Sequence, residues 1–185
     1  MLTKLIFSLP LLWPVLGLPN PLSTNELAPS TAVIHDTHWS SQNTCTPPSC
    51  RVYKSPTSNG HDLTTMLTFK YPAGFAGKQC WLEFFVPQGG VGTGGHLVDI
   101  FRQWQPVETC PSQGNNRDIQ LGRMEIPVGG GKAGWTERYS RYLTEPTKCP
   151  VGGTIEGFEV VGVGDAEDVN WKQGVGVGVR VVYTT

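Results

Sequence analysis

Four tryptophans beyond residue 80 have the side chains best suited to binding a ligand: Trp81, Trp104, Trp135 and Trp171. The flat face of an indole packs against the apolar face of a sugar ring, and its N–H can donate one hydrogen bond. Gathered on one exposed face, the four would form a platform for a carbohydrate. Tryptophan more often fills the core or rim of a small β domain, so the sequence leaves both interpretations open.

Acidic residues are the second candidate set. Asp165, Glu167 and Asp168 crowd three carboxylates into one short segment, which suits calcium binding. Paired-acid glycoside hydrolysis would need a further glutamate from elsewhere in the chain, such as Glu137, Glu156 or Glu159. The spacing is not that of an EF-hand loop, and a solvated acidic loop is the simpler interpretation. We therefore predict no metal site here.

Two glycine-rich segments match phosphate-binding loops only in part. Residues 90–95 have the G-x-G-x-x-G spacing but lie in no βαβ unit, so a flexible hairpin loop is preferred. Gly131-Lys132 is followed by Ala133 instead of the Ser or Thr that holds magnesium. The chain has four histidines and no G-x-S-x-G elbow, so no nucleophilic triad is visible. We predict no catalytic residues and no cofactor.

The amino-terminal residues have the layout of a cleavable secretory signal. Lys4 precedes an apolar run over residues 5–16 and a small-residue site at 15–17. This run is too short for a permanent membrane helix, and no later stretch is apolar enough for one. We expect a signal peptide over 1–17, a mature chain that begins at Leu18, and a secreted product that is extracellular or held in the cell wall.

Secretion makes disulfides the expected role of the cysteines. There are five, so at least one is left without a partner: Cys45, Cys50, Cys80, Cys110 and Cys149. Metal binding is the weaker alternative because no histidine lies at a suitable spacing from them.

Charge and composition predict a single folded unit after a polar segment. Lys and Arg number 14 against 15 Asp and Glu, and this balance argues against a basic surface for nucleic acid or anionic lipid. Residues 18–50 are rich in Pro, Ser, Thr and Asn, which predicts an extended lead-in with candidate O-glycan sites. Residues 51–185 then form one domain.

Alternating apolar and polar residues predict β strands in that domain. The alternation is clearest over 63–71, 80–86 and 175–183, with further candidates at 119–128 and 155–163. Residues 97–104 also fit helical spacing, and we expect a strand there. In the last strand, glycines on one face suggest close backbone approach. Turns rich in Gly and Pro, without a long amphipathic helix, predict an all-β antiparallel sandwich or open barrel.

Part of the chain resembles a known family. FKYP at 69–72 and GKQCWLEFFVP at 77–87 resemble the segment F-x-x-P…GKxCxLxFxFP of the fungal ubiquitin 3 binding protein (But-two) C-terminal domain family. CPVGG at 149–153 resembles that family's later C-P-x-G step. The likeness covers about residues 60–183, although Trp81 and Glu83 depart from the pattern and the middle of the chain does not align. The resemblance implies a fungal, secreted or surface β-sandwich with no established catalytic residues.

The same resemblance implies a disulfide pairing. Cys80 and Cys149 occupy matching family positions, so these two are expected to pair. Cys45 would then pair with Cys50, and Cys110 would be left over.

Three function classes stay open. The chain can be a non-catalytic secreted protein that is wall-associated or effector-like, a carbohydrate-binding module, or a hydrolase with an unrecognised site. The expected partner is a cell-wall polysaccharide or an extracellular protein. Tryptophans clustered on one exposed face would favour the second class, and two carboxylates facing each other across a cleft would favour the third.

Overall fold

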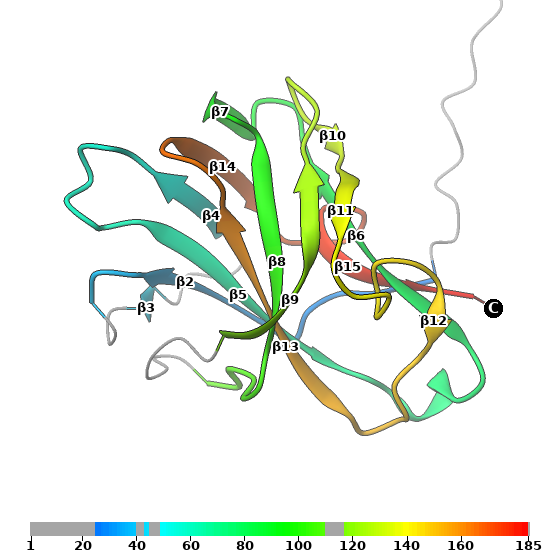
Figure 1. The fold of residues 1–185 in the computed structure, drawn as a ribbon. Coiled ribbons are helices and arrows are strands. Elements are labelled where there is room, and N and C mark those ends of the chain that lie inside the picture. The colour runs from blue at the N-terminus through cyan, green and yellow to red at the C-terminus, as the bar shows by residue number, and fades with distance from the viewer. Residues whose placement is uncertain (1–24, 40–42, 45–48, 110–116, 185) are drawn as a thin grey trace, which may run out of the picture.

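The computed structural model describes residues 25–39, 43–44, 49–109 and 117–184 as two antiparallel β sheets (Figure 1). The helical content of this part is one 3-10 turn, Ala73–Phe75. The predicted all-β class and antiparallel sandwich are confirmed. The expected signal peptide lies outside the described residues.

The smaller sheet has five strands with β6 at its centre. Its order is β1 (Glu26–Leu27), β15 (Gly178–Tyr183), β6 (Gln79–Val86) and β10 (Gly131–Lys132), and β12 (Thr147–Lys148) also pairs with β6. Even-numbered residues of β6 are buried and most odd-numbered ones are half-buried. This is the period of two that the sequence predicted, and it places Trp81, Glu83 and Phe85 on the outer face.

The larger sheet has ten strands. Its main order is β11 (Gly134–Arg138), β9 (Arg117–Glu125), β8 (Leu97–Gln103), β13 (Ile155–Gly162), β5 (Leu63–Lys70), β4 (Ser49–Lys54), β14 (Glu167–Lys172) and β7 (Val91–Gly94). Two more strands, β2 (Thr31–Asp36) and β3 (Asn43–Thr44), extend it beside β5. The ambiguous residues 97–104 therefore form a strand, as expected.

The folded unit begins before residue 51, in the segment that we expected to be an extended lead-in. β2 pairs with β5 from Thr31 to Asp36, and β1 pairs with β15. Val33 is buried against Met66 and Val107. The apolar patch of β2 is too short to be recognised alone, and it is buried by residues that lie far away in the sequence.

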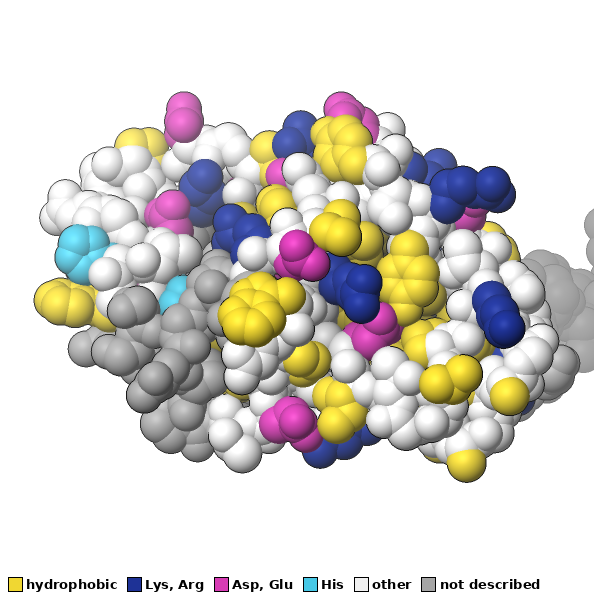
Figure 2. Space-filling view, turned by 60° about the horizontal axis from the view of Figure 1, so that its bottom comes forward, with side chains coloured by type: hydrophobic (Ala, Val, Ile, Leu, Met, Phe, Trp, Pro, Cys, Tyr) yellow, Lys and Arg dark blue, Asp and Glu magenta, His cyan; other side chains and the backbone are white. Residues whose placement is uncertain are grey.

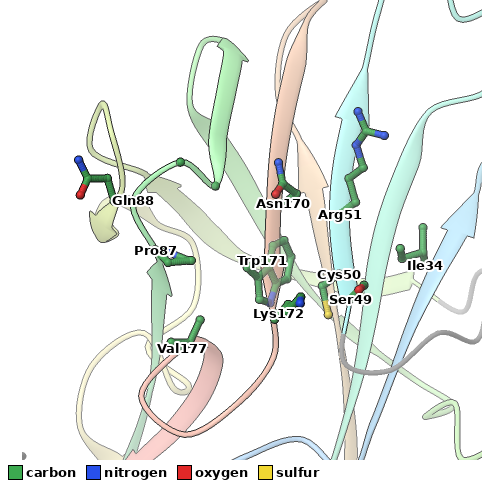
Figure 3. A pocket seen from close by; sticks show the side chains of 12 residues that line it. Ile34, Ser49, Cys50, Arg51, Pro87, Gln88, Asn170, Trp171, Lys172 and Val177 are labelled. Carbon is green, nitrogen blue, oxygen red and sulfur yellow. The ribbon is translucent and has the colours of Figure 1, made fainter.

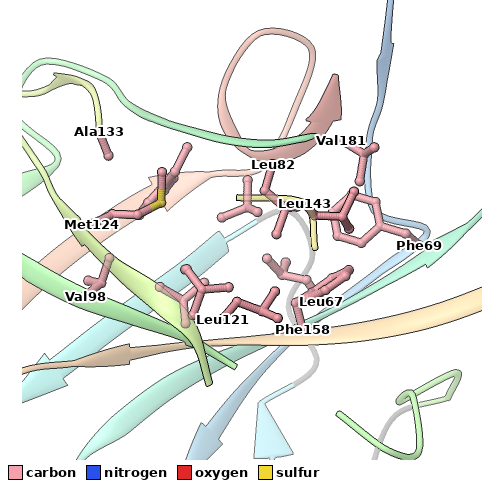
Figure 4. Packing of buried hydrophobic residues seen from close by; sticks show 14 of the residues in the cluster. Leu67, Phe69, Leu82, Val98, Leu121, Met124, Ala133, Leu143, Phe158 and Val181 are labelled. Atoms are coloured by element: carbon pink, nitrogen blue, oxygen red, sulfur yellow. The ribbon is translucent and has the colours of Figure 1, made fainter. Parts of the chain in front are cut away.

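The core lies between the two sheets. Figure 4 shows Leu82 and Val181 of the smaller sheet facing Leu67 and Phe158 of the larger one. All four side chains are buried, and burial of each such side chain contributes about 1.5–3 kcal/mol. The core thus fixes which residues of β6 point outward.

Cys80 and Cys149 form a disulfide across 69 residues of sequence, which confirms the pairing implied by the resemblance. Cys50 is a buried thiol whose pKa burial raises to about 12. This contradicts the expected bridge between Cys45 and Cys50, because β4 places Cys50 on the inner face of the larger sheet. Cys45 and Cys110 lie outside the described residues.

The closing strand is shorter than its alternation predicted. β15 begins at Gly178, and the preceding residues form a turn with a bridge between Gly174 and Val177. Gly176 and Gly178 have φ values of 71° and 84°, a left-handed conformation that glycine adopts without strain. Gly176 therefore serves the turn, and Gly178 begins the strand.

Candidate functional site

A surface groove of about 340 Å³ lies where β6 of the smaller sheet meets β11 of the larger one. Its lining combines two tryptophans with charged and apolar side chains: Trp81, Leu82, Glu83, Met124, Lys132, Ala133, Gly134, Trp135, Arg138, Thr144, Glu145 and Pro146. We call it the Trp81–Trp135 groove. It unites two of the four tryptophans that the sequence singled out.

The groove borders an interrupted edge of β6. Two short strands pair with this edge, β12 opposite Cys80 and β10 opposite Phe85. Between them, the Leu82 N–H donates to the Leu143 carbonyl at 2.7 Å, and the Phe84 carbonyl accepts from the Ala133 N–H at 2.8 Å. The Leu82 carbonyl and the Phe84 N–H point to the same edge, and both residues are buried. The two short strands thus cover this edge of β6 only in part.

Trp81 projects from the outer face of β6 and is half-buried. Its indole Nε1 donates to Glu83 Oε1 at 3.1 Å. Residues two apart on one strand share a face, so this hydrogen bond holds the indole along the strand. The ring is therefore oriented before any ligand arrives.

Trp135 lies on the edge strand β11 and packs partly against the core. Its ring lies over Gly122 of β9, where a Cβ atom would come within 3.0 Å of Trp135 Cζ3 and 2.3 Å of the Glu137 carbonyl oxygen. A β-bulge falls between Trp135 and Glu137, and bulges re-aim side chains at sheet edges. Gly122 thus allows β11 to lie close enough for Trp135 to reach the groove.

Glu83 is the electrostatic centre of the groove. It accepts hydrogen bonds from Lys132 Nζ at 2.5 Å and Arg180 Nη2 at 3.0 Å, besides the one from Trp81. Burial disfavours the ionised carboxylate, but these donors outweigh burial and lower the Glu83 pKa. Glu83 is therefore ionised at neutral pH and balances the charge of Lys132.

The remaining two charges of the groove are also engaged. Arg138 Nε donates to the Thr144 carbonyl at 3.2 Å, and Glu145 pairs with Arg141. The lining thus carries two acidic and two basic side chains, and its formal charge is zero.

The wall formed by residues 139–148 is tied to β6 at several points. The Leu143 carbonyl accepts from Leu82, and the Cys149 N–H donates to the Lys78 carbonyl at 2.9 Å. Leu143 is fully buried with a φ of 58°. The Cys80–Cys149 disulfide closes this wall at its carboxyl end.

The other two tryptophans do not join the groove. Trp171 is only 3% exposed and packs edge-to-face on Phe84 at 4.8 Å, with its Nε1 donating to Gln173. Trp104 is 68% exposed and follows β8. Of the four tryptophans, the groove thus brings together only Trp81 and Trp135, because β14 turns Trp171 into the core.

Trp171 instead lines a second pocket, of about 510 Å³. Figure 3 shows its ring between Pro87 and Val177 on one side and Cys50 on the other. Because the ring is buried, its face cannot stack on a ligand. We therefore prefer the Trp81–Trp135 groove as the candidate site.

The three carboxylates of the acidic segment do not converge. Glu167 is buried and accepts from the backbone N–H groups of His96 and Leu97, both at 3.1 Å, while burial raises its pKa. Asp168 forms a bidentate pair with Arg51, and Asp165 lines a shallow pocket elsewhere. The carboxylate of Glu167 thus supports the residues that follow the G-x-G-x-x-G segment.

The other glutamates do not form a facing pair either. Glu156 and Glu159 are three residues apart on β13, so they point to opposite faces. Glu156 accepts from the Tyr142 hydroxyl at 2.6 Å, and Glu159 is paired with Arg117. Among the described residues no group of three or more His, Cys, Asp or Glu side chains is placed to hold a metal ion.

An Asp–His pair lies at the β2 end of the larger sheet. His61 Nδ1 and Asp36 Oδ2 are 2.9 Å apart, and the His38 ring stacks on His61 with centroids 4.3 Å apart. Within the described residues no serine is hydrogen-bonded to the His61 ring. The pair therefore lacks the nucleophile of a triad.

No family model matches the chain, and no curated protein matches it. The likeness to the But-two C-terminal domain stays a prediction from the sequence. Within the described part of the chain, no helix has the length and apolarity needed to cross a membrane.

Proposed function

We propose that this chain is a secreted, non-catalytic recognition domain that binds a carbohydrate in the Trp81–Trp135 groove. The observation that carries the proposal is the convergence of two half-buried indoles, from different sheets, on one groove. A disulfide-closed β-sandwich with a signal-like amino terminus supports the secreted location.

The chemistry of the groove suits a sugar. A sugar ring has an apolar face for stacking and a rim of hydroxyl groups that both donate and accept hydrogen bonds. The indoles of Trp81 and Trp135 offer stacking surfaces. The Lys132 ammonium has donors besides the one used by Glu83.

Surface charge supports the same choice of ligand. Figure 2 shows Lys, Arg, Asp and Glu side chains interspersed with hydrophobic ones on one face, and the described residues of that face form no basic stripe. Nucleic acid binding relies on such a stripe. A cell-wall polysaccharide is the partner that fits the proposed location and the groove together.

The proposal is tested by binding of the purified protein to insoluble chitin, cellulose and β-1,3-glucan. Trp81→Ala and Trp135→Ala should each weaken binding to the retained polysaccharide about tenfold, since an aromatic contact is worth about 0.5–1.5 kcal/mol beyond its buried area. Trp104→Ala is the matched control, because Trp104 is exposed outside the groove. Equal loss in all three variants, or binding to none of the polymers, would contradict the proposal.

A further inference from the structure

The outer face of β6 continues beyond the groove. Trp81, Glu83 and Phe85 alternate with buried residues, and all three are half-buried. Phe85 does not line the groove, although it lies on the same face of the same strand as Trp81. Two aromatic side chains therefore flank Glu83 along one line.

The two aromatic residues are farther apart than one sugar ring is wide. A strand rises about 3.3 Å per residue, so the four-residue step from Trp81 to Phe85 spans about 13 Å. A monosaccharide that stacks on Trp81 cannot reach Phe85. A chain of linked sugars that follows β6 can contact both.

The neighbouring strands leave Phe85 accessible on this face. Gly178 of β15 lies directly opposite Phe85 and contributes no side chain of its own, with the Gln173 side chain beside it, and Phe85 stays half-buried. On the other side, Lys132 lies opposite Phe85 and extends toward Glu83. Polar and aromatic groups thus alternate from Trp81 past Glu83 and Lys132 to Phe85.

The charges along this line are already paired. Glu83 is held by Lys132 and Arg180, and Arg180 also pairs with Glu26 at 3.4 Å. A carboxylated or sulfated sugar would compete with Glu83 for Lys132, and binding it would leave that carboxylate with fewer partners. A neutral sugar can accept from Lys132 without displacing Glu83.

From these observations we infer that the site takes an internal stretch of a linear, neutral polysaccharide, which runs along β6 from Trp81 to Phe85. This inference rests on the proposed function and adds the direction, extent and charge class of the ligand. Trp81 and Trp135 hold one sugar unit in the groove, and Phe85 holds a later unit of the same chain.

The test is calorimetric titration with soluble oligosaccharides of one to six units, β-1,4-linked N-acetylglucosamine and β-1,3-linked glucose, with oligogalacturonate as the anionic probe. Affinity for a neutral series should rise with chain length. Phe85→Thr should weaken binding of the longest oligomer about tenfold, which corresponds to the loss of one aromatic contact. The affinity for the shortest oligomer that binds should stay unchanged. Threonine keeps the β propensity of the position, and an unchanged melting temperature confirms the fold.

The outcomes separate the two proposals. Binding that is independent of chain length and of Phe85, yet lost in Trp81→Ala, would overturn the linear-chain inference and keep the groove. Preference for oligogalacturonate would overturn the neutral-ligand inference alone. Absence of binding to every oligosaccharide and to the insoluble polymers would overturn the proposed function itself.

Discussion

The disulfide between Cys80 and Cys149 joins the strand that carries Trp81 to the end of the segment that forms the opposite wall of the groove. Cys80 lies next to Trp81 on β6, and Cys149 directly follows β12. One covalent bond therefore holds two walls of the candidate site in place.

Loss of this bond should reduce both stability and binding. For a loop of about 70 residues the chain-entropy model gives about 4 kcal/mol, so Cys80→Ala/Cys149→Ala should unfold at a clearly lower urea concentration than the wild type. Urea titration followed by circular dichroism measures this change. An unchanged midpoint would show that the wall is held by its hydrogen bonds alone.

Gly122 should be needed for the position of Trp135. An alanine there would collide with the Glu137 carbonyl and the Trp135 ring, and overpacking of this kind costs about 1–3 kcal/mol. Gly122→Ala should lower the melting temperature and weaken polysaccharide binding.

Gly174→Ala is the matched control, because a Cβ at Gly174 meets nothing within 4 Å and Gly174 does not line the groove. Equal effects of the two alanines would argue against close packing at Gly122 as the cause.

Glu83 should make stability fall at acidic pH. Its folded pKa is lowered from an ordinary value of 4.5, so its ionised form stabilises the fold above that pH, and the contribution is lost as pH falls through the folded pKa. Glu83→Gln should lower the free energy of unfolding near neutral pH by about 2 kcal/mol.

The difference in the free energy of unfolding between Glu83→Gln and the wild type should shrink as the pH falls below 4.5. Urea titrations across this pH range measure it, with the exposed Glu125→Gln as control. A difference that stays constant with pH would show that the ionisation of Glu83 is not its source.

Secretion is testable without reference to the groove. The signal layout predicts that the mature protein begins at Leu18, and amino-terminal sequencing of protein from the culture medium determines this directly. Recovery of the chain from the cytosol with Met1 in place would contradict the expected compartment, and the disulfide would lose its supporting context.

The sequence predicted those strands in which apolar and polar residues alternate along the strand itself. Residues 63–71 and 80–86 became β5 and β6 almost as expected, because one face of each packs in the core. β2 was missed because its partners, β5 and Val107, lie more than 25 residues away. The glycines before Gly178 were assigned to a strand face because backbone φ values are not visible in an alternation pattern.

The candidate site depends on pairings that no local pattern reports. The sequence identified Trp81 and Trp135 by residue type, but their proximity follows from β10 pairing with β6 while β11 pairs with β9. Strand geometry also explains why Trp171 lies outside the groove, because β14 points its side chain into the core. Glu83, Lys132 and Gly122 were not expected as site residues, although the position of Glu83 two residues after Trp81 was a usable signal.

The most direct test of the central claim is a heteronuclear NMR titration that follows the indole Nε1–H resonances while a neutral oligosaccharide is added. Groove binding predicts that the resonances of Trp81 and Trp135 shift with ligand concentration, while those of the buried Trp171 and of Trp104, which does not line the groove, stay in place. Shifts confined to Trp104 or Trp171, with Trp81 and Trp135 unchanged, would contradict the account.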